Sequence, residues 1–166
     1  LFQSKSSGCD HKGEGSCPGS REHSFAKAES APVQEVQNQA SQLTHWPIQL
    51  HLINPNAGFL KNSDLLLAAD CTAYTLGSFH SQLLKGKTLA IACPKLDTNK
   101  EVYVDKLRLM IDEARINTIT LAIMEVPCCG GLLQLINLAR ETATRTVPVR
   151  RIVIGIQGDI LSDDWV

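Results

Sequence analysis

The stretch TITLAIMEVPCCGGLLQLINLARETATRTVPVRRIVIGIQ, residues 118–157, decides the fold that the sequence predicts. It begins with an apolar run at 118–126, continues with a helix-like stretch at 131–145 and ends with a second apolar run at 149–157. Both runs are nearly continuous in Val, Ile and Leu, as in strands that are covered on both faces. A strand, a helix and a second strand of these lengths form a right-handed βαβ unit of a parallel sheet.

The same alternation occurs upstream. Apolar runs at 64–70 (DLLLAAD) and 88–93 (TLAIAC) are followed by helix-like stretches at 72–84 and 99–116. In the second stretch, five apolar residues are expected on one helical face: Val102, Leu107, Met110, Ile111 and Ala114. The sequence therefore predicts an α/β three-layer sandwich with a four- or five-stranded, mainly parallel sheet.

Composition changes near residue 44. Residues 1–44 are polar and rich in Gly and Ser, and we expect a flexible segment that carries Cys9 and Cys17. Residues 45–166 form the predicted α/β domain. Its first stretch, HWPIQLHLINP at 45–55, is interpreted either as an edge strand or as an extended segment packed across the domain.

Charge and hydropathy exclude several classes of partner. The net charge is −1, basic residues form no stripe and only 5% of residues are aromatic, so neither nucleic acid nor a membrane surface is expected as a partner. No apolar run approaches the roughly 18 residues that span a bilayer. The polar N-terminus has no secretory h-region, and we expect a cytoplasmic protein.

Four of the six cysteines follow predicted strands. Cys71 directly follows the run at 64–70, Cys93 ends the run at 88–93, and Cys128 and Cys129 follow the run at 118–126. Because the carboxyl ends of parallel strands meet at one edge of a sheet, these thiols are expected to converge at the C-terminal strand edge. Disulfides are disfavoured, because the chain is large enough to fold without them and carries no export signal.

Thiolates are soft ligands that select iron–sulfur clusters, zinc or copper(I). Zinc sites usually use C-x₂-C pairs, and this sequence has none. Thiols supplied one from each loop suit a [4Fe–4S] cluster, whose fourth ligand is expected to be Cys17 in SCPGS. The sequence thus predicts cluster binding by Cys17, Cys71, Cys93 and Cys128, with Cys129 as an alternative ligand or a neighbouring thiol, for one-electron transfer or redox sensing.

Other interpretations remain open. The same thiols could hold zinc in a structural module, or Cys128 or Cys129 could be the nucleophile of a thiol enzyme, its pKa lowered by the N-terminus of the helix that follows. Single buried cysteines are common core residues. Cys9, His11 and Cys17 form a C-x-H-x₅-C pattern that is more typical of a solvated tail than of a metal clip. The GIQG stretch at 155–158 is typical of a turn.

A nucleotide site has little support in the sequence. The first predicted strand is followed by DCTAY, 70–74, and not by the Gly-rich loop of the dinucleotide fingerprint.

The strings LLLAADCTAYTLGSFH, KGKTLAIACPKLD and EVPCCGGL, preceded by CPGS, resemble bacterial ferredoxin-like 4Fe-4S-binding proteins, over residues 16 to 160. The resemblance implies cluster binding by Cys17, Cys71, Cys93, Cys128 and Cys129, in anaerobes, with a redox partner protein or a ferredoxin-type domain. That family typically carries two C-x₂-C-x₂-C-x₃-C-P motifs upstream, and this sequence has none. We expect either the C-terminal module alone or a form without the ferredoxin part. A homo-oligomer stays open.

Overall fold

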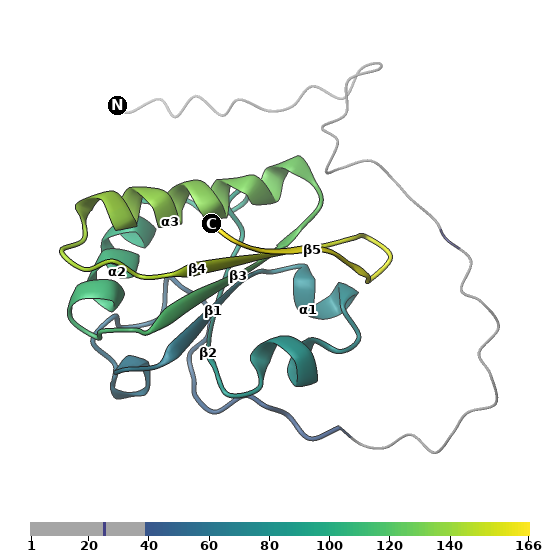
Figure 1. The fold of residues 1–166 in the computed structure, drawn as a ribbon, viewed down its shortest axis with the longest axis horizontal. Coiled ribbons are helices and arrows are strands. Elements are labelled where there is room, and N and C mark those ends of the chain that lie inside the picture. The colour runs from purple at the N-terminus through teal and green to yellow at the C-terminus, as the bar shows by residue number, and fades with distance from the viewer. Residues whose placement is uncertain (1–24, 26–38) are drawn as a thin grey trace, which may run out of the picture.

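One mixed sheet organises the molecule. The computed structural model describes residue 25 and residues 39–166 (Figure 1). The strand order is β2-β1-β3-β4-β5, with all neighbours parallel except β4 and β5, which are antiparallel. The strands are β1 (Asp64–Ala69), β2 (Thr88–Ala92), β3 (Thr118–Met124), β4 (Val149–Ile154) and β5 (Ile160–Trp165).

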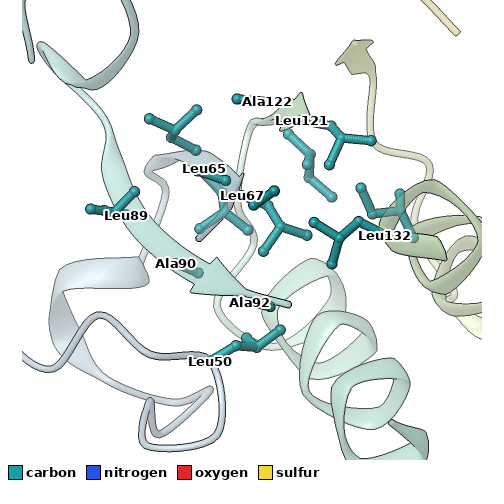
Figure 2. Close-up of a cluster of buried hydrophobic side chains, with 14 of the residues drawn as sticks. Leu50, Leu65, Leu67, Leu89, Ala90, Ala92, Leu121, Ala122 and Leu132 are labelled. Carbon is teal, nitrogen blue, oxygen red and sulfur yellow. The ribbon is translucent and has the colours of Figure 1, made fainter. Parts of the chain in front are cut away.

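The central strands are buried on both faces. Leu65, Leu66 and Leu67 of β1 are all fully buried, as are Leu121 and Ala122 of β3. Side chains of β1, β2 and β3 converge with Leu132 from the helix after β3 in one apolar cluster (Figure 2). A continuous aliphatic run is what a strand between two helical layers requires.

Helices cover both faces. Figure 1 shows α2 (Glu101–Asp112) and α3 (Gly131–Thr142) side by side along one face of the sheet, with α1 (Thr72–Thr75) and the π-helix η3 (Phe79–Leu84) on the other. Two short 3₁₀ helices, η2 (Gly58–Leu60) and η4 (Pro127–Gly130), complete the elements. The predicted three-layer α/β fold with a mainly parallel sheet is confirmed.

The helix predicted at 72–84 is interrupted. It forms as α1 and η3, separated at Leu76–Ser78, where Leu76 takes an extended conformation with ψ 105°. The predicted core face of α2 also needs one correction. Tyr103 is fully buried in place of Val102, which is 41% exposed, because the helix begins at Glu101 and the Tyr103 hydroxyl finds a hydrogen-bond partner inside the domain.

The segment at 45–55 runs beside the outer edge of β2. Ile91 of β2 donates its N–H to the Ile48 carbonyl at 2.8 Å and accepts the Leu50 N–H at 2.9 Å. Gln49 forms a single bridge with Ile91, and Leu50 and Ile53 are fully buried. The interpretation as an extended segment packed across the domain therefore holds, and no full edge strand forms.

The final strand is shorter than predicted and is followed by another. The strand predicted at 149–157 ends at Ile154, and the GIQG stretch turns the chain into the antiparallel β5. Gly158 takes φ 94° in this turn, and its N–H donates to the Gly155 carbonyl at 2.9 Å. Glycine is favoured there because other residues rarely adopt such a positive φ.

Candidate functional site

The strand order reverses between β1 and β3. The chain leaves β1 for β2 on one side, then crosses back to β3 on the other side. In open α/β sheets, ligands bind at such a switch point, outside the carboxyl ends of the strands. The loops after β1, β2 and β3 therefore form the candidate site.

Each of these loops carries a cysteine. Cys71 follows β1 after one residue and is exposed, whereas Cys93 directly follows β2 and is half-buried. Cys128, also half-buried, lies in η4 after β3, next to the buried Cys129. These four cysteines form no disulfide with one another.

The thiol of Cys71 is influenced by the charges of the neighbouring loops. The pKa of Cys71 is raised, first by burial and then by the negative charges of Cys93, Asp70 and Cys128. Such repulsion requires proximity, because charges at a protein surface are strongly screened beyond roughly 10 Å. Cys93 and Cys128 are therefore near enough to Cys71 for their charges to raise its pKa, although they come from loops far apart in sequence.

Direct packing joins the loops after β2 and β3. A Cβ atom at Gly131, the first residue of α3, would lie 3.0 Å from the Cβ of Pro94. Only glycine lets the helix start approach Pro94 this closely without displacing it. Since Pro94 adjoins Cys93 and Gly131 lies three residues after Cys128, this contact holds the two thiol-bearing loops against each other.

Asp97 fixes the loop that carries Cys93. Its Oδ2 accepts the Cys93 N–H at 2.8 Å, the Tyr103 hydroxyl at 2.6 Å and the Gln49 side-chain amide at 3.3 Å. The pKa of Tyr103 is raised, first by burial and then by its hydrogen bond to Asp97. The carboxylate therefore ties the Cys93 loop both to α2 and to the segment beside β2.

Asp70 places a second carboxylate at this edge. Its Oδ1 is buried and has no hydrogen-bond partner among residue 25 and residues 39–166. Burial raises the pKa of Asp70, and the charge of Asp97 raises it further. Neither carboxylate takes part in an ion pair with any residue that the structure describes. The site is rich in acidic groups that would be stabilised by a positive centre.

Cys129 differs from the other three thiols. It is 5% exposed and belongs to the hydrophobic core. Burial, with contributions from the neighbouring Cys128, raises the pKa of Cys129 to about 11. The expectation of a lowered pKa is wrong for this thiol, because the loss of water around the thiolate outweighs the backbone hydrogen bond with Met124, which lowers the pKa.

The remaining sequence candidates contribute less. Cys9, His11 and Cys17 lie outside the described residues. In the GIQG turn, the Ile156 N–H donates to Glu125 Oε1 at 2.8 Å, so a carboxylate already occupies the position that an anion would need. Among residue 25 and residues 39–166, no group of three or more His, Cys, Asp or Glu side chains is close enough to hold a single metal ion.

Sequence reasoning missed the two carboxylates. Asp97 lies four residues after Cys93 in CPKLD, and this spacing could have suggested a turn in which the carboxylate caps the Cys93 N–H. Asp70 adjoins Cys71, but the absence of a partner for its Oδ1 depends on contacts that sequence does not reveal.

Comparisons with known proteins bear on the family. A family described as a Rossmann-like domain matches residues 57–165. A protein of Archaeoglobus fulgidus described as uncharacterized is 24% identical over 121 residues, covering 72% of this chain and 83% of that protein. No solved structure matches. The resemblance to ferredoxin-like 4Fe-4S proteins is therefore corrected: the matched family is Rossmann-like, and neither finding indicates a ferredoxin-like family.

No helix in the part of the chain that the structure describes is long and apolar enough to cross a membrane.

Proposed function

The chain belongs to the Rossmann-like domain family, and we propose that it binds an iron–sulfur cluster, most simply [4Fe–4S], at the switch point of its sheet. The ligands would include Cys71, Cys93 and Cys128, and the role would be one-electron transfer or redox sensing. The observation that carries this proposal is the position of these three free thiols, each in the loop that follows one of the parallel strands β1, β2 and β3 at the switch point.

The chemistry of the donor set fits such a group. In the metal-free protein, the charges of Cys93, Asp70 and Cys128 raise the pKa of Cys71, and the charge of Asp97 raises the pKa of Asp70. A cationic iron centre reverses this effect, because it favours the thiolate form of each ligand. When bound, the cluster would supply a site that accepts and releases one electron.

The arrangement favours a cluster over a zinc knuckle. A knuckle draws two ligands from one turn, whereas here each of the three half-buried or exposed thiols comes from a different loop. Cys129 packs in the core, so we assign it no ligand role. The fourth ligand stays a prediction from sequence, Cys17, which lies outside the described residues.

The neighbouring surface is consistent with a redox partner protein. Tyr74, three residues after Cys71, is 93% exposed, and Leu96, three residues after Cys93, is 79% exposed. Large apolar side chains at the rim of a redox site suit transient docking, in which a partner approaches the thiol-bearing edge.

The Rossmann-like fold alone does not make a nucleotide the better ligand. The loop after β1 carries Asp70 and Cys71 instead of glycines, and α1 has only four residues. A phosphate at this position would be repelled by two carboxylates that have no ion-pair partner among the described residues, Asp70 and Asp97, where nucleotide sites normally provide N–H groups.

The test is metal analysis of protein purified without oxygen. About four irons and four sulfides per chain, with broad brown absorption, are expected for a [4Fe–4S] protein. Stoichiometric zinc without colour would replace the proposal with a structural zinc module. A chain that takes up no metal even after reconstitution would overturn the proposal, and rapid alkylation of Cys128 would then favour a thiol enzyme.

Matched variants identify the ligands. Cys93→Ser is expected to lose iron, whereas Cys9→Ser is expected to retain it. Far-ultraviolet circular dichroism of both metal-free variants controls for folding. Full iron content in Cys93→Ser would remove this residue from the ligand set.

A further inference from the structure

A separate cavity lies behind the loop that carries Cys71. Its volume is about 160 Å³, and it lies between β1 and β2 on one side and α1 and η3 on the other. Aliphatic and aromatic side chains form most of its wall, with Ile48 and Leu43 contributed by the segment beside β2. α2 and α3 contribute nothing to the lining.

One polar group in this wall lacks a partner. Asp70 lines the cavity, and its buried Oδ1 accepts no hydrogen bond from any described residue. Two other polar groups of the lining already have partners: the Thr72 hydroxyl donates to the Ala69 carbonyl at 2.8 Å, and His80 Nδ1 accepts the Gln42 N–H at 3.1 Å. A buried carboxylate oxygen without a donor is costly, so the cavity offers an unused acceptor.

The charges of the residues around the cavity favour a positively charged ligand. No Lys or Arg occurs among the lining residues, and Asp97 adds a second negative charge near Asp70. A ligand that donates a hydrogen bond and carries a positive charge would satisfy Asp70 Oδ1. The apolar remainder of the wall would bury a hydrocarbon group.

We propose that this cavity binds a small apolar primary amine. Its ammonium group would donate to Asp70 Oδ1, and its hydrocarbon part would pack between Ile48 and the side chains of η3. The size is appropriate, because an engineered cavity of about 150 Å³ with similar walls holds benzene. The site adjoins the thiols but requires no metal, so it stands independently of the proposed cluster.

Benzylamine is the probe, and toluene and benzyl alcohol are the matched comparisons. Calorimetric titration of the purified full chain is expected to give one saturable benzylamine site with a Kd of about 1 mM. Benzyl alcohol should bind more weakly, and toluene at least about tenfold more weakly, because neither supplies an ammonium group to the carboxylate. Equal affinity for benzylamine and toluene would overturn the proposed role of Asp70.

Variants locate the site. Asp70→Asn should weaken benzylamine binding at least about tenfold, whereas Asp105→Asn, a change at an exposed carboxylate of α2, should leave it unchanged. Ile48→Trp fills the cavity and keeps Asp70, so it should also abolish binding, even if Asp70→Asn fails to fold. Unchanged binding in Ile48→Trp would place the amine elsewhere and overturn the proposal.

The same titration separates this proposal from cluster binding. Benzylamine should bind both the protein as isolated and the metal-free protein. If the chain proves to bind no metal, amine binding should persist. Absence of saturable benzylamine binding in either form would overturn the amine site, whatever the iron content.

Discussion

Asp70 and Asp163 lie in opposite environments of the same sheet. Asp163 of β5 accepts a hydrogen bond from Arg150 Nε of β4 at 2.6 Å, and this contact holds its pKa below the ordinary value. Asp70, after β1, has a buried oxygen without a partner and a raised pKa. Both aspartates are at least partly exposed to solvent, but only Asp70, at the switch point, lacks a positively charged partner among the described residues. In this pair, the aspartate without a counter-charge lies at the candidate functional edge, and the compensated one lies at the structural margin.

The largest effect is expected from replacing cysteines, because the iron content should distinguish a proposed ligand from a cysteine that packs in the core. Cys71→Ser is expected to lose essentially all bound iron, because a cluster ligand is removed. Cys129→Ala should retain the iron, because its side chain packs in the core. Iron and sulfide analysis checks both. Equal loss in the two variants would make Cys129 a ligand and contradict its assignment to the core.

Gly158 connects the β4–β5 turn to the functional edge. A Cβ atom there would lie 2.6 Å from the Thr75 carbonyl oxygen, at a φ of 94°. Gly158→Ala should lower the free energy of unfolding by about 2 to 4 kcal/mol, since it adds a backbone clash to the conformational strain.

Gly86→Ala is the matched control for that change. Gly86 has φ 77° but open space around it, so only the strain applies, at about 1 kcal/mol. Urea denaturation measures both variants. A cost for Gly158→Ala no larger than that for Gly86→Ala would mean that the turn does not rest against α1.

The Asp97 network tests whether the Cys93 loop is held by its carboxylate. Tyr103→Phe removes one donor and should cost about 1 kcal/mol of unfolding free energy. Asp97→Asn should cost more, about 1 to 3 kcal/mol, because it weakens the acceptor of three hydrogen bonds. Thermal unfolding of both metal-free variants provides the comparison. If Tyr103→Phe were the more destabilising change, packing of the ring would outweigh the carboxylate.

The smallest effect is expected at the structural margin. Asp163 has a lowered folded pKa, so its pair with Arg150 stabilises the fold above the unfolded pKa, and the gain is lost as pH falls through the folded pKa. The Asp163 side chain is 38% exposed, and solvent screening limits the gain to a few tenths of a kcal/mol. Asp163→Asn should therefore reduce stability slightly at pH 7, and this loss should shrink as the pH falls through the folded pKa of Asp163. High salt should diminish the difference, and a salt-independent loss would indicate packing instead of charge.

The sequence predicted the fold where one local signal sufficed. The aliphatic runs of β1 to β4 indicate buried strands without any knowledge of their neighbours. β5 was missed because ILSDDW is mostly exposed on both faces and obtains its regularity from pairing with β4. The break between α1 and η3 was missed for a similar reason, since the apolar residues of 72–84 fit one continuous helix.

The candidate site likewise has features that local sequence predicts and features that depend on tertiary contacts. The positions of Cys71, Cys93 and Cys128 after their strands follow from the predicted strands, because parallel strands end at one edge. The Asp97 partners Cys93 and Tyr103 are close in sequence, but Gln49 lies 48 residues away and could not be foreseen. The lack of a partner for Asp70 Oδ1 depends on the folded surroundings of that oxygen, which sequence does not reveal. The raised pKa of Cys129 depends on the depth of burial, which a sequence motif does not specify.

The two outer strands of the sheet have a consequence for aggregation. An open strand edge invites another chain to add to it, and proteins commonly prevent this by covering the edge or by placing charges along it. Here the segment at 48–50 brackets Ile91 on the β2 side, whereas β5 on the other side carries Asp163 and Asp164. The covering segment on the β2 side and the negative charges on the β5 side thus both oppose the addition of further strands, which would extend the sheet into a fibril. Neutralising both aspartates should therefore promote fibrils that grow from the β5 flank.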